Sequence, residues 1–194
     1  MKKIFEKGSF REYRVDALNE AAGPMVHAGY ELAEKKVTVF ISHKHDEVDD
    51  LKDIIGFLEK KYNVKAYIDS NDISMPKTTS EETAKKIKEK IEKCDNFILL
   101  ATDGAIESKW CNWELGYGDA HKYKGNKLAL FPMKEKGTND SLYKGNEYLK
   151  IYPYITYYDG SEKYSNGMPI SKGYYVQYRE NGEYYITPLD KWFK

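Results

Sequence analysis

Short apolar segments alternate with segments of helical periodicity through the middle of the chain, and this alternation constrains the fold more than any other feature. The apolar segments cover 37–42, 64–69, 96–101 and 128–133. The helical segments cover 47–62 and 108 to about 123, and a third one begins at the capping-box tetrad 79–82. Short β-branched runs between amphipathic helices are typical of a parallel sheet whose strands are buried on both faces and joined by right-handed crossovers. The sequence therefore predicts an α/β fold.

The two ends of the chain depart from this alternation. Residues 1–36 are charged and weakly patterned, and the short helix expected over 15–22 would stop at Gly23-Pro24. Twelve of the 18 tyrosines lie after residue 142, where strand-like runs flank Asn181-Gly182, the strongest short signal for a β-hairpin. A stacking platform for single-stranded nucleic acid is disfavoured, because the tyrosines lack accompanying basic residues. We expect an N-terminal extension over 1–36 and a β-rich C-terminal extension over 156–194 that packs on the core.

The charge balance and the cysteine count exclude several classes of protein. Thirty-one basic side chains match 31 acidic ones, so no net positive field exists to attract nucleic acid or anionic lipid. No segment approaches the roughly 20 apolar residues of a membrane helix, and early charges interrupt any signal-peptide core. Cys94 and Cys111 alone cannot form a disulfide framework or a structural zinc site. We expect a cytoplasmic protein without nucleic-acid or membrane partners.

Chemistry in such a fold is expected in the loops after the strands, since ligands of doubly wound sheets bind beyond the carboxyl ends of the strands. These loops are 43–46, 70–78 and 102–111. None of them carries a glycine-rich dinucleotide fingerprint, a P-loop or a nucleophile elbow. His43, His45 and Asp46 could suggest a metal, but alternate residues leaving a strand point in opposite directions and zinc needs three convergent ligands. We expect no metal.

The segment 108–118 is the most informative one. Trp110 and Glu114 lie four residues apart, so a helix places them on one stripe. Tyr117 and His121 continue that stripe. A carboxylate beside an indole could form the wall of a ligand site; the alternative is that the tryptophans are ordinary core aromatics and the glutamate a solvated charge. Spacing alone leaves both interpretations open.

Two glycines in the same helix also need an explanation. Gly116 and Gly118 each cost roughly 1 kcal/mol in a helix interior relative to alanine. We expect close packing against a neighbouring element to offset this cost.

Four blocks of the sequence together resemble a known family. They are VFISHKHD at 39–46, AYID at 66–69, CDNFILL at 94–100 and SKWCNWEL at 108–115. In order and spacing they are similar to Toll/interleukin-1 receptor (TIR) domains, over about residues 37–155, and the most specific element is the W-x-x-x-E pair of Trp110 and Glu114. The resemblance implies a flavodoxin-like, doubly wound, five-stranded parallel sheet, with 151–155 as the fifth strand and the tyrosine-rich hairpin as a C-terminal extension.

The resemblance implies two alternative functions. Many prokaryotic TIR domains cleave NAD+ at the nicotinamide ribosyl bond, and some cyclise the remaining ADP-ribose into a signal for anti-phage defence, as in Thoeris systems. Other TIR domains only assemble with one another through the loop after the second strand, here 70–78. Residues 71–76 of that loop lack the glycine common there, and the tyrosine-rich tail lies outside the usual TIR boundary; both are departures from the family pattern.

Residue roles follow from the resemblance position by position. Glu114 matches the catalytic glutamate, and the implied substrate-binding residues are Phe40, Ser42, His43, Asp46 and Trp110. NAD+ would be a substrate, and no further cofactor is implied. The expected partners are other copies of the chain and a downstream protein that senses the product.

One carboxylate could suffice for the NAD+ cleavage that the resemblance implies. Glycosidases pair two carboxylates because an alkoxide leaving group must be protonated, whereas nicotinamide leaves the pyridinium of NAD+ as a neutral base. The remaining task is to stabilise positive charge on the ribose, which an ionised Glu114 could do. A phosphoryl-accepting receiver domain of the same topology is disfavoured, because His43 and His45 stand where its paired acids would be.

Overall fold

The computed structural model describes residues 3–16, 36–68 and 80–194 of the 194-residue chain. Most of the helix expected over 15–22 and the whole of the loop 70–78 lie outside these residues. Among the described helices, none has both the length and the apolar character that a membrane crossing requires.

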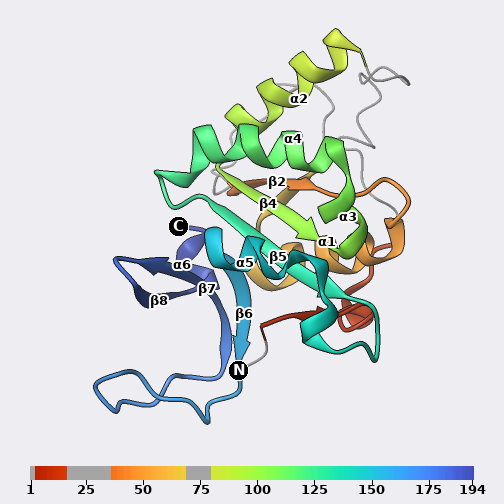
Figure 1. The fold of residues 1–194 in the computed structure, drawn as a ribbon. Helices are drawn as coiled ribbons and strands as arrows, with labels where there is room; N and C mark the ends of the chain where they lie inside the picture. Colours follow the sequence, from red (N-terminus) through yellow and green to blue (C-terminus); the bar gives the residue numbers. More distant parts are fainter. Residues whose placement is uncertain (1–2, 17–35, 69–79) are drawn as a thin grey trace, which may run out of the picture.

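The described strands form an eight-stranded sheet in the order β3-β2-β4-β5-β6-β7-β8, and β1 pairs with β5 off this path (Figure 1). Their bounds are β1 Phe5–Glu6, β2 Thr38–Ser42, β3 Lys65–Tyr67, β4 Asn96–Ala101, β5 Leu128–Lys134, β6 Tyr154–Tyr158, β7 Gly173–Glu180 and β8 Glu183–Pro188. Neighbours from β3 to β6 pair in parallel. β2 to β5 match the apolar runs of the sequence, whereas β6 begins at Tyr154 instead of residue 151. The predicted α/β fold is confirmed.

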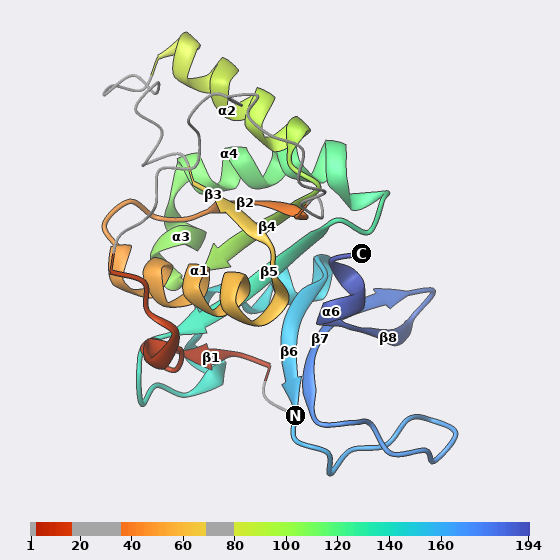
Figure 2. The same ribbon diagram turned by 180° about the vertical axis from the view of Figure 1, so that it is seen from behind.

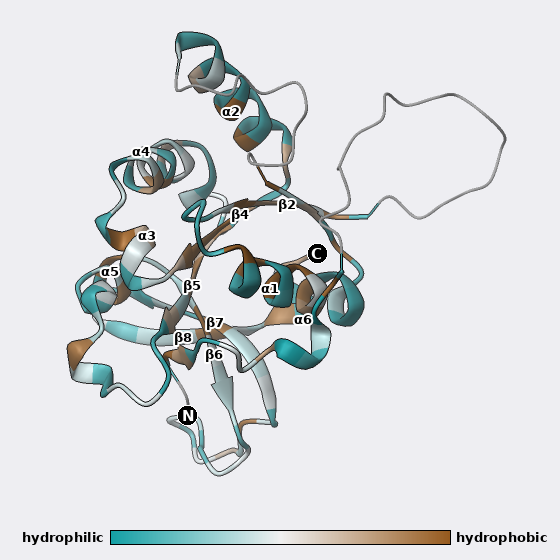
Figure 3. Cartoon of the chain, turned by 90° about the vertical axis from the view of Figure 1, so that its right-hand side faces the viewer, coloured by the Kyte–Doolittle hydropathy of each residue, from teal (hydrophilic) through white to brown (hydrophobic). Residues whose placement is uncertain are grey.

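Helices cover both faces of the sheet (Figure 3). One face carries α1 Val48–Tyr62 and α6 Leu189–Trp192, and the other carries α2 Glu81–Lys93, α3 Asp103–Glu107, α4 Lys109–Gly118 and α5 Tyr148–Ile151. Shorter helical turns cover Arg11–Tyr13, Asp119–Tyr123, Asp140–Leu142 and Lys144–Asn146. Because side chains alternate along a strand, Val39 and Ile41 of β2 pack with α1, whereas Phe40 packs with the α2 and α4 layer.

Serine hydroxyls cap the starts of α2 and α4 on the second face. The Ser80 hydroxyl accepts a hydrogen bond from the Thr83 amide at 3.2 Å, which starts α2. Ser108 accepts one from the Cys111 amide at 3.3 Å, which starts α4. A serine side chain in this position satisfies an amide that the first turn leaves unpaired. The cap at Ser108 was predicted from the sequence, whereas α2 is capped by the second residue of the tetrad 79–82 and not by the first, as capping-box spacing implies.

The strand count differs from the prediction of a five-stranded sheet. β7 continues the sheet antiparallel to β6, and β8 continues it antiparallel to β7 (Figure 2). Asn181 and Gly182, at φ 50° and 86°, form the turn between them. The hairpin therefore extends the sheet instead of docking on it, because the outer edge of β6 offers unpaired backbone groups that a neighbouring strand satisfies.

The N-terminal segment also contributes to the sheet and the core. β1 pairs in parallel with the last residues of β5, at Met133 and Lys134, whereas β6 pairs with β5 at Leu130. Phe5 and Phe10 are each only 2% exposed, in the same hydrophobic cluster as α1 and β2. Their isolation among charged residues explains why sequence periodicity does not reveal them.

The same segment packs tightly along α1. Arg14 donates a hydrogen bond from Nε to Oδ1 of Asp53 at 2.6 Å, and that carboxylate is fully buried. One turn further along the helix, Gly56 faces the backbone of Tyr13, whose carbonyl oxygen also accepts a hydrogen bond from Lys60 at 3.1 Å. A glycine at position 56 therefore allows the segment to approach the helix backbone.

Gly56→Ala tests this close approach. The added methyl carbon would lie 1.9 Å from the Tyr13 carbonyl oxygen, so the segment or the helix must shift. We expect the free energy of unfolding to fall by about 1–3 kcal/mol in urea denaturation.

Gly116→Ala is the matched control, since Gly116 is also inside a helix but a Cβ there meets nothing within 4 Å. Alanine should raise stability there by about 0.5–1 kcal/mol. Equal effects of the two substitutions would contradict the docking of the N-terminal segment.

Candidate active site

The order of the strands reverses at β2, which lies between β3 and β4. At such a reversal the loops leaving the two strands diverge, and a crevice opens beyond their carboxyl ends. A pocket of about 320 Å³ lies at this place, and its lining residues are His43, Lys44, His45, Asp46, Ser108, Trp110 and Cys111. The pocket thus joins the loop after β2 to the first turn of α4, two of the regions that the sequence predicts.

Ser42 and Glu114 meet in the interior next to this pocket. The Ser42 hydroxyl, at the end of β2, donates a short hydrogen bond to Oε2 of Glu114 on α4. Both residues are only 1% exposed. The alternative of a solvated Glu114 is therefore wrong, because α4 turns Cys111, Glu114 and Leu115 toward the sheet.

The loop after β2 brings two histidines and an ion pair to the pocket. His43 is 3% exposed, and its Nδ1 lies 3.3 Å from the Ile41 carbonyl oxygen. Its ring meets the His45 ring edge to face, with centroids 5.6 Å apart. Asp46 is exposed, and its Oδ2 lies 3.1 Å from Nζ of Lys44. A hydrogen bond from the Lys44 ammonium lowers the pKa of the Asp46 carboxyl below its ordinary value.

Two predicted substrate-binding residues lie in different surroundings. Trp110 is half-buried and lines the pocket, with its ring stacked on Trp113 at a centroid distance of 4.8 Å. Phe40 is 1% exposed and stacks on Phe97 at 5.7 Å in the core. The structure does not bring Phe40 to the pocket, because alternation along β2 directs its ring between the sheet and the α2 and α4 layer.

The aromatic stripe of α4 differs from the predicted one. Trp113, Tyr117 and His121 continue the stack from Trp110, with successive centroid distances of 4.8, 6.2 and 4.3 Å. Glu114 lies beside this stack and faces the sheet, so Trp113 occupies the position in the stripe that was predicted for the glutamate. The carboxylate and the aromatic rings belong to different faces of the helix.

The two helix glycines have different surroundings. A Cβ at Gly118 would lie 3.0 Å from the Phe97 ring, so close packing explains this glycine as predicted. Gly116 is exposed and a Cβ there would meet nothing within 4 Å. The packing explanation is therefore wrong for Gly116.

Sequence reasoning named the loops of the pocket but missed some of its lining residues. Lys44, His45, Ser108 and Cys111 line the pocket together with the residues singled out by the resemblance. All four lie in the loops 43–46 and 102–111, which the rule that ligands bind beyond the carboxyl ends of strands had selected, but no motif marked these residues individually as substrate-binding. Within the described ranges, no three histidine, cysteine or acidic side chains are grouped as a metal site would require.

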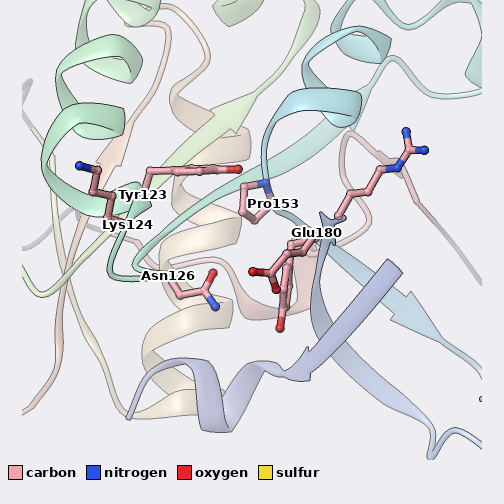
Figure 4. A pocket seen from close by; sticks show the side chains of 7 residues that line it. Tyr123, Lys124, Asn126, Pro153 and Glu180 are labelled. Carbon is pink, nitrogen blue, oxygen red and sulfur yellow. The ribbon is translucent and has the colours of Figure 1, made fainter. Parts of the chain in front are cut away.

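A second pocket, of about 270 Å³, lies at the opposite ends of the strands. It is lined by Tyr123, Lys124, Asn126, Pro153, Tyr178, Arg179 and Glu180. Figure 4 shows Tyr123 and Lys124 on one side of it and Glu180 on the other, with Pro153 between them. Asn126 lies two residues before β5 and Pro153 directly precedes β6, so this pocket is at the amino ends of the strands, away from the reversal point.

Comparison with known proteins places the pocket within a known type of domain. A family model described as TIR domain matches residues 39–167. A protein of Bacillus cereus (strain MSX-D12) named "Probable 3' cyclic ADP-D-ribose synthase ThsB'" is 29% identical over 141 residues, 71% of this chain and 70% of the relative. A protein of Cytobacillus dafuensis named "Putative cyclic ADP-D-ribose synthase TIR2" is 32% identical over 87 residues, 43% of this chain and 23% of the relative.

A double-mutant cycle tests the contact between Ser42 and Glu114. Ser42→Ala removes the hydroxyl donor from a buried carboxylate, and we expect a loss of about 1–3 kcal/mol in the free energy of unfolding. In a Glu114→Leu background the same change should cost less, giving a coupling of at least about 0.5 kcal/mol in urea denaturation. Ser108→Ala is the control, since Ser108 caps α4 through the Cys111 amide, and its effect should be the same in both backgrounds.

Proposed function

The chain belongs to the TIR domain family, and from this membership we propose that it is an enzyme that cleaves the nicotinamide ribosyl bond of NAD+. The observation that carries the proposal is the Glu114 carboxylate, buried and hydrogen-bonded to Ser42 beside a pocket at the reversal of strand order. NAD+ is the substrate in this proposal, and the products are nicotinamide and a linear or cyclic ADP-ribose.

The reaction requires the protein mainly to stabilise positive charge on the ribose. The bond between the ribose C1 carbon and the pyridinium nitrogen breaks, its electron pair stays on nitrogen, and nicotinamide leaves neutral. Positive charge then develops on the ribose, where an ionised carboxylate stabilises it. Water that attacks this carbon loses a proton and gives ADP-ribose, whereas a nucleophile within the same molecule loses its proton and gives a cyclic product.

Glu114 is the group that we assign to this electrostatic task. Ser42 orients the Glu114 carboxylate by donating a hydrogen bond to it. A hydroxyl of a bound ribose would donate a second hydrogen bond to the same carboxylate. The carboxylate lies where few water molecules can screen it, and electrostatic stabilisation is stronger in such a place than in water. Because Glu114 is 1% exposed, the substrate must displace neighbouring side chains to contact it.

The pocket supplies the remaining contacts of the proposal. Trp110 offers an indole face to the nicotinamide or adenine ring, and His43 and Asp46 offer polar groups to ribose or amide. Phe40 supports the site from the core through its stack on Phe97. Its direct contact with the substrate stays a prediction.

The names of the relatives favour a cyclic product. Both relatives are named as cyclic ADP-D-ribose synthases, and one of them aligns with 71% of this chain. We propose that the chain makes a cyclic ADP-ribose in the cytoplasm, that this product is a signal in anti-phage defence, and that a downstream effector senses it. A non-catalytic TIR interaction module is the alternative, and nicotinamide release separates the two.

Glu114→Gln is the decisive variant. It keeps the size of the side chain and an oxygen for the Ser42 hydroxyl, but it removes the charge. We expect nicotinamide release to fall by roughly 100-fold or more, the scale of losing one preorganised electrostatic contact. The melting temperature should change little. Chromatography of NAD+ incubated with the pure protein measures the rate and identifies the second product.

Two further variants make this measurement specific. Glu183→Gln, an exposed glutamate on β8, should retain full activity. Trp110→Ala should weaken NAD+ binding with a stability loss of only about 1–2 kcal/mol, because its indole is half-buried and not enclosed in the core. If Glu114→Gln released nicotinamide at the wild-type rate, the catalytic assignment of Glu114 would be wrong and the non-catalytic interaction module would be the better interpretation.

Activity is also expected to depend on self-association. The resemblance assigns assembly to the loop 70–78, which lies outside the described residues. If one copy contributes this loop to the site of another, nicotinamide release per molecule should rise with protein concentration and level off when association is complete. Sedimentation measured over the same concentrations supplies the comparison. Turnover per molecule that stays constant in a strictly monomeric protein would contradict this proposal.

A further inference from the structure

A single carboxylate, Glu47, anchors the loop that forms one wall of the pocket. Glu47 directly follows Asp46, and its amide donates a hydrogen bond to the Lys44 carbonyl oxygen at 3.0 Å, which closes the turn. Its side chain is 13% exposed. Loop 43–46 therefore ends at a residue whose carboxylate is largely withdrawn from water.

Two groups from distant parts of the chain hold this carboxylate. Lys7 donates from Nζ to Oε1 at 2.9 Å, and the Thr102 hydroxyl donates a short hydrogen bond to Oε2. Thr102 is fully buried, and it also caps α3 by accepting from the Ala105 amide at 3.0 Å. The carboxylate thus links the N-terminal segment, the end of β4 and the loop of the pocket.

The loop also rests directly on the first turn of α3. A Cβ at Gly104 would lie 2.7 Å from Cδ of Lys44 and 3.1 Å from Oε1 of Glu47. Little space is therefore left between the turn 44–47 and the helix. The Lys44 stem and the Glu47 carboxylate thus pack together against α3, and the pocket residues 43–46 belong to the same turn.

Lys7 is itself held firmly. Its amide donates to the Lys134 carbonyl oxygen at 2.9 Å, extending the pairing of β1 with β5. Its Nζ lies 2.6 Å from Oε1 of Glu135 and 4.0 Å from Oδ2 of Asp50, and it also donates the hydrogen bond to Glu47. Burial by itself would lower the pKa of Lys7, but hydrogen bonds to Glu135 and Glu47, together with the attraction of their negative charges, raise this pKa overall, so the ammonium stays charged.

We propose that Lys7 is a positioning residue for the pocket: through Glu47, its ammonium fixes the loop 43–46 in the geometry that binds the substrate. The inference rests on the proposed function and adds to it a residue outside the region that the family model matches. Without this cation, three carboxylates, those of Glu47, Asp50 and Glu135, surround the site of the lost charge and repel one another.

Lys7→Met tests the proposal, because methionine keeps an unbranched apolar stem and removes the charge. We expect KM for NAD+ to rise about tenfold while kcat stays within about threefold, since the displaced loop is part of the binding wall. Lys7→Arg, which restores a cation, should recover most of the affinity. Ring signals of His43 and His45 in NMR spectra should shift in Lys7→Met and return toward wild type in Lys7→Arg.

Arg14→Met is the matched control. Arg14 lies in the same segment and pairs with buried Asp53 on α1, but it does not contact Glu47. Its loss should lower the melting temperature while KM and the signals of His43 and His45 stay as in the wild type. If Lys7→Met behaves like Arg14→Met, the ammonium is only structural and the proposal is overturned.

The same measurements also test the proposal if the wild type is inactive or if Lys7→Met does not fold. If the wild type releases no nicotinamide, the proposed function fails, and the histidine signals of the folded variants alone support or overturn the positioning role. If Lys7→Met does not fold, Lys7→Gln, which retains a hydrogen-bond donor without the charge, takes its place with the same expected results. Unchanged KM and unchanged histidine signals in that variant overturn the proposal.

Discussion

Complete burial of the two central strands is the constraint on which the rest of the structure depends. Every residue of β4 and β5 is buried, so their backbone groups must be satisfied by neighbouring strands and their side chains by helices on both faces. With both faces covered, ligands can reach the sheet only at its ends. The polar side chains of the pocket therefore gather where β2 and β4 end, at the reversal of strand order.

Within this apolar framework, the buried carboxylate of Glu114 is costly. Removing a charged group from water lowers stability unless hydrogen bonds compensate, and Ser42 supplies such a bond. An alternative residue of similar size and no charge would fold at least as well at this position. The burial of a carboxylate beside a pocket is typical of functional sites, and this supports the proposed assignment of Glu114 to the reaction.

The two ends of the chain complete the same core instead of forming appendages. Phe5 and Phe10 from the N-terminal segment share one hydrophobic cluster with Val176 of β7 and Trp192 of α6. β1 pairs with the end of β5, and the β7–β8 hairpin covers the edge of β6. Each end thus pairs backbone groups that the strands of the core would leave open, and through Lys7 the N-terminal segment also reaches the loop of the pocket.

Local patterns in the sequence determined the elements of this protein. Hydrophobic periodicity and serine caps are properties of neighbouring residues, so the strands β2 to β5, α1 and the start of α4 at Ser108 could be predicted from the sequence alone. Tertiary contacts alone decided that Glu114 bonds to Ser42, which is 72 positions away in the chain. They also decided that Trp113, and not Glu114, joins the aromatic stack of α4, and that Phe5 lies in the core. No periodicity encodes such contacts, because they arise only when segments far apart in the chain are packed against one sheet.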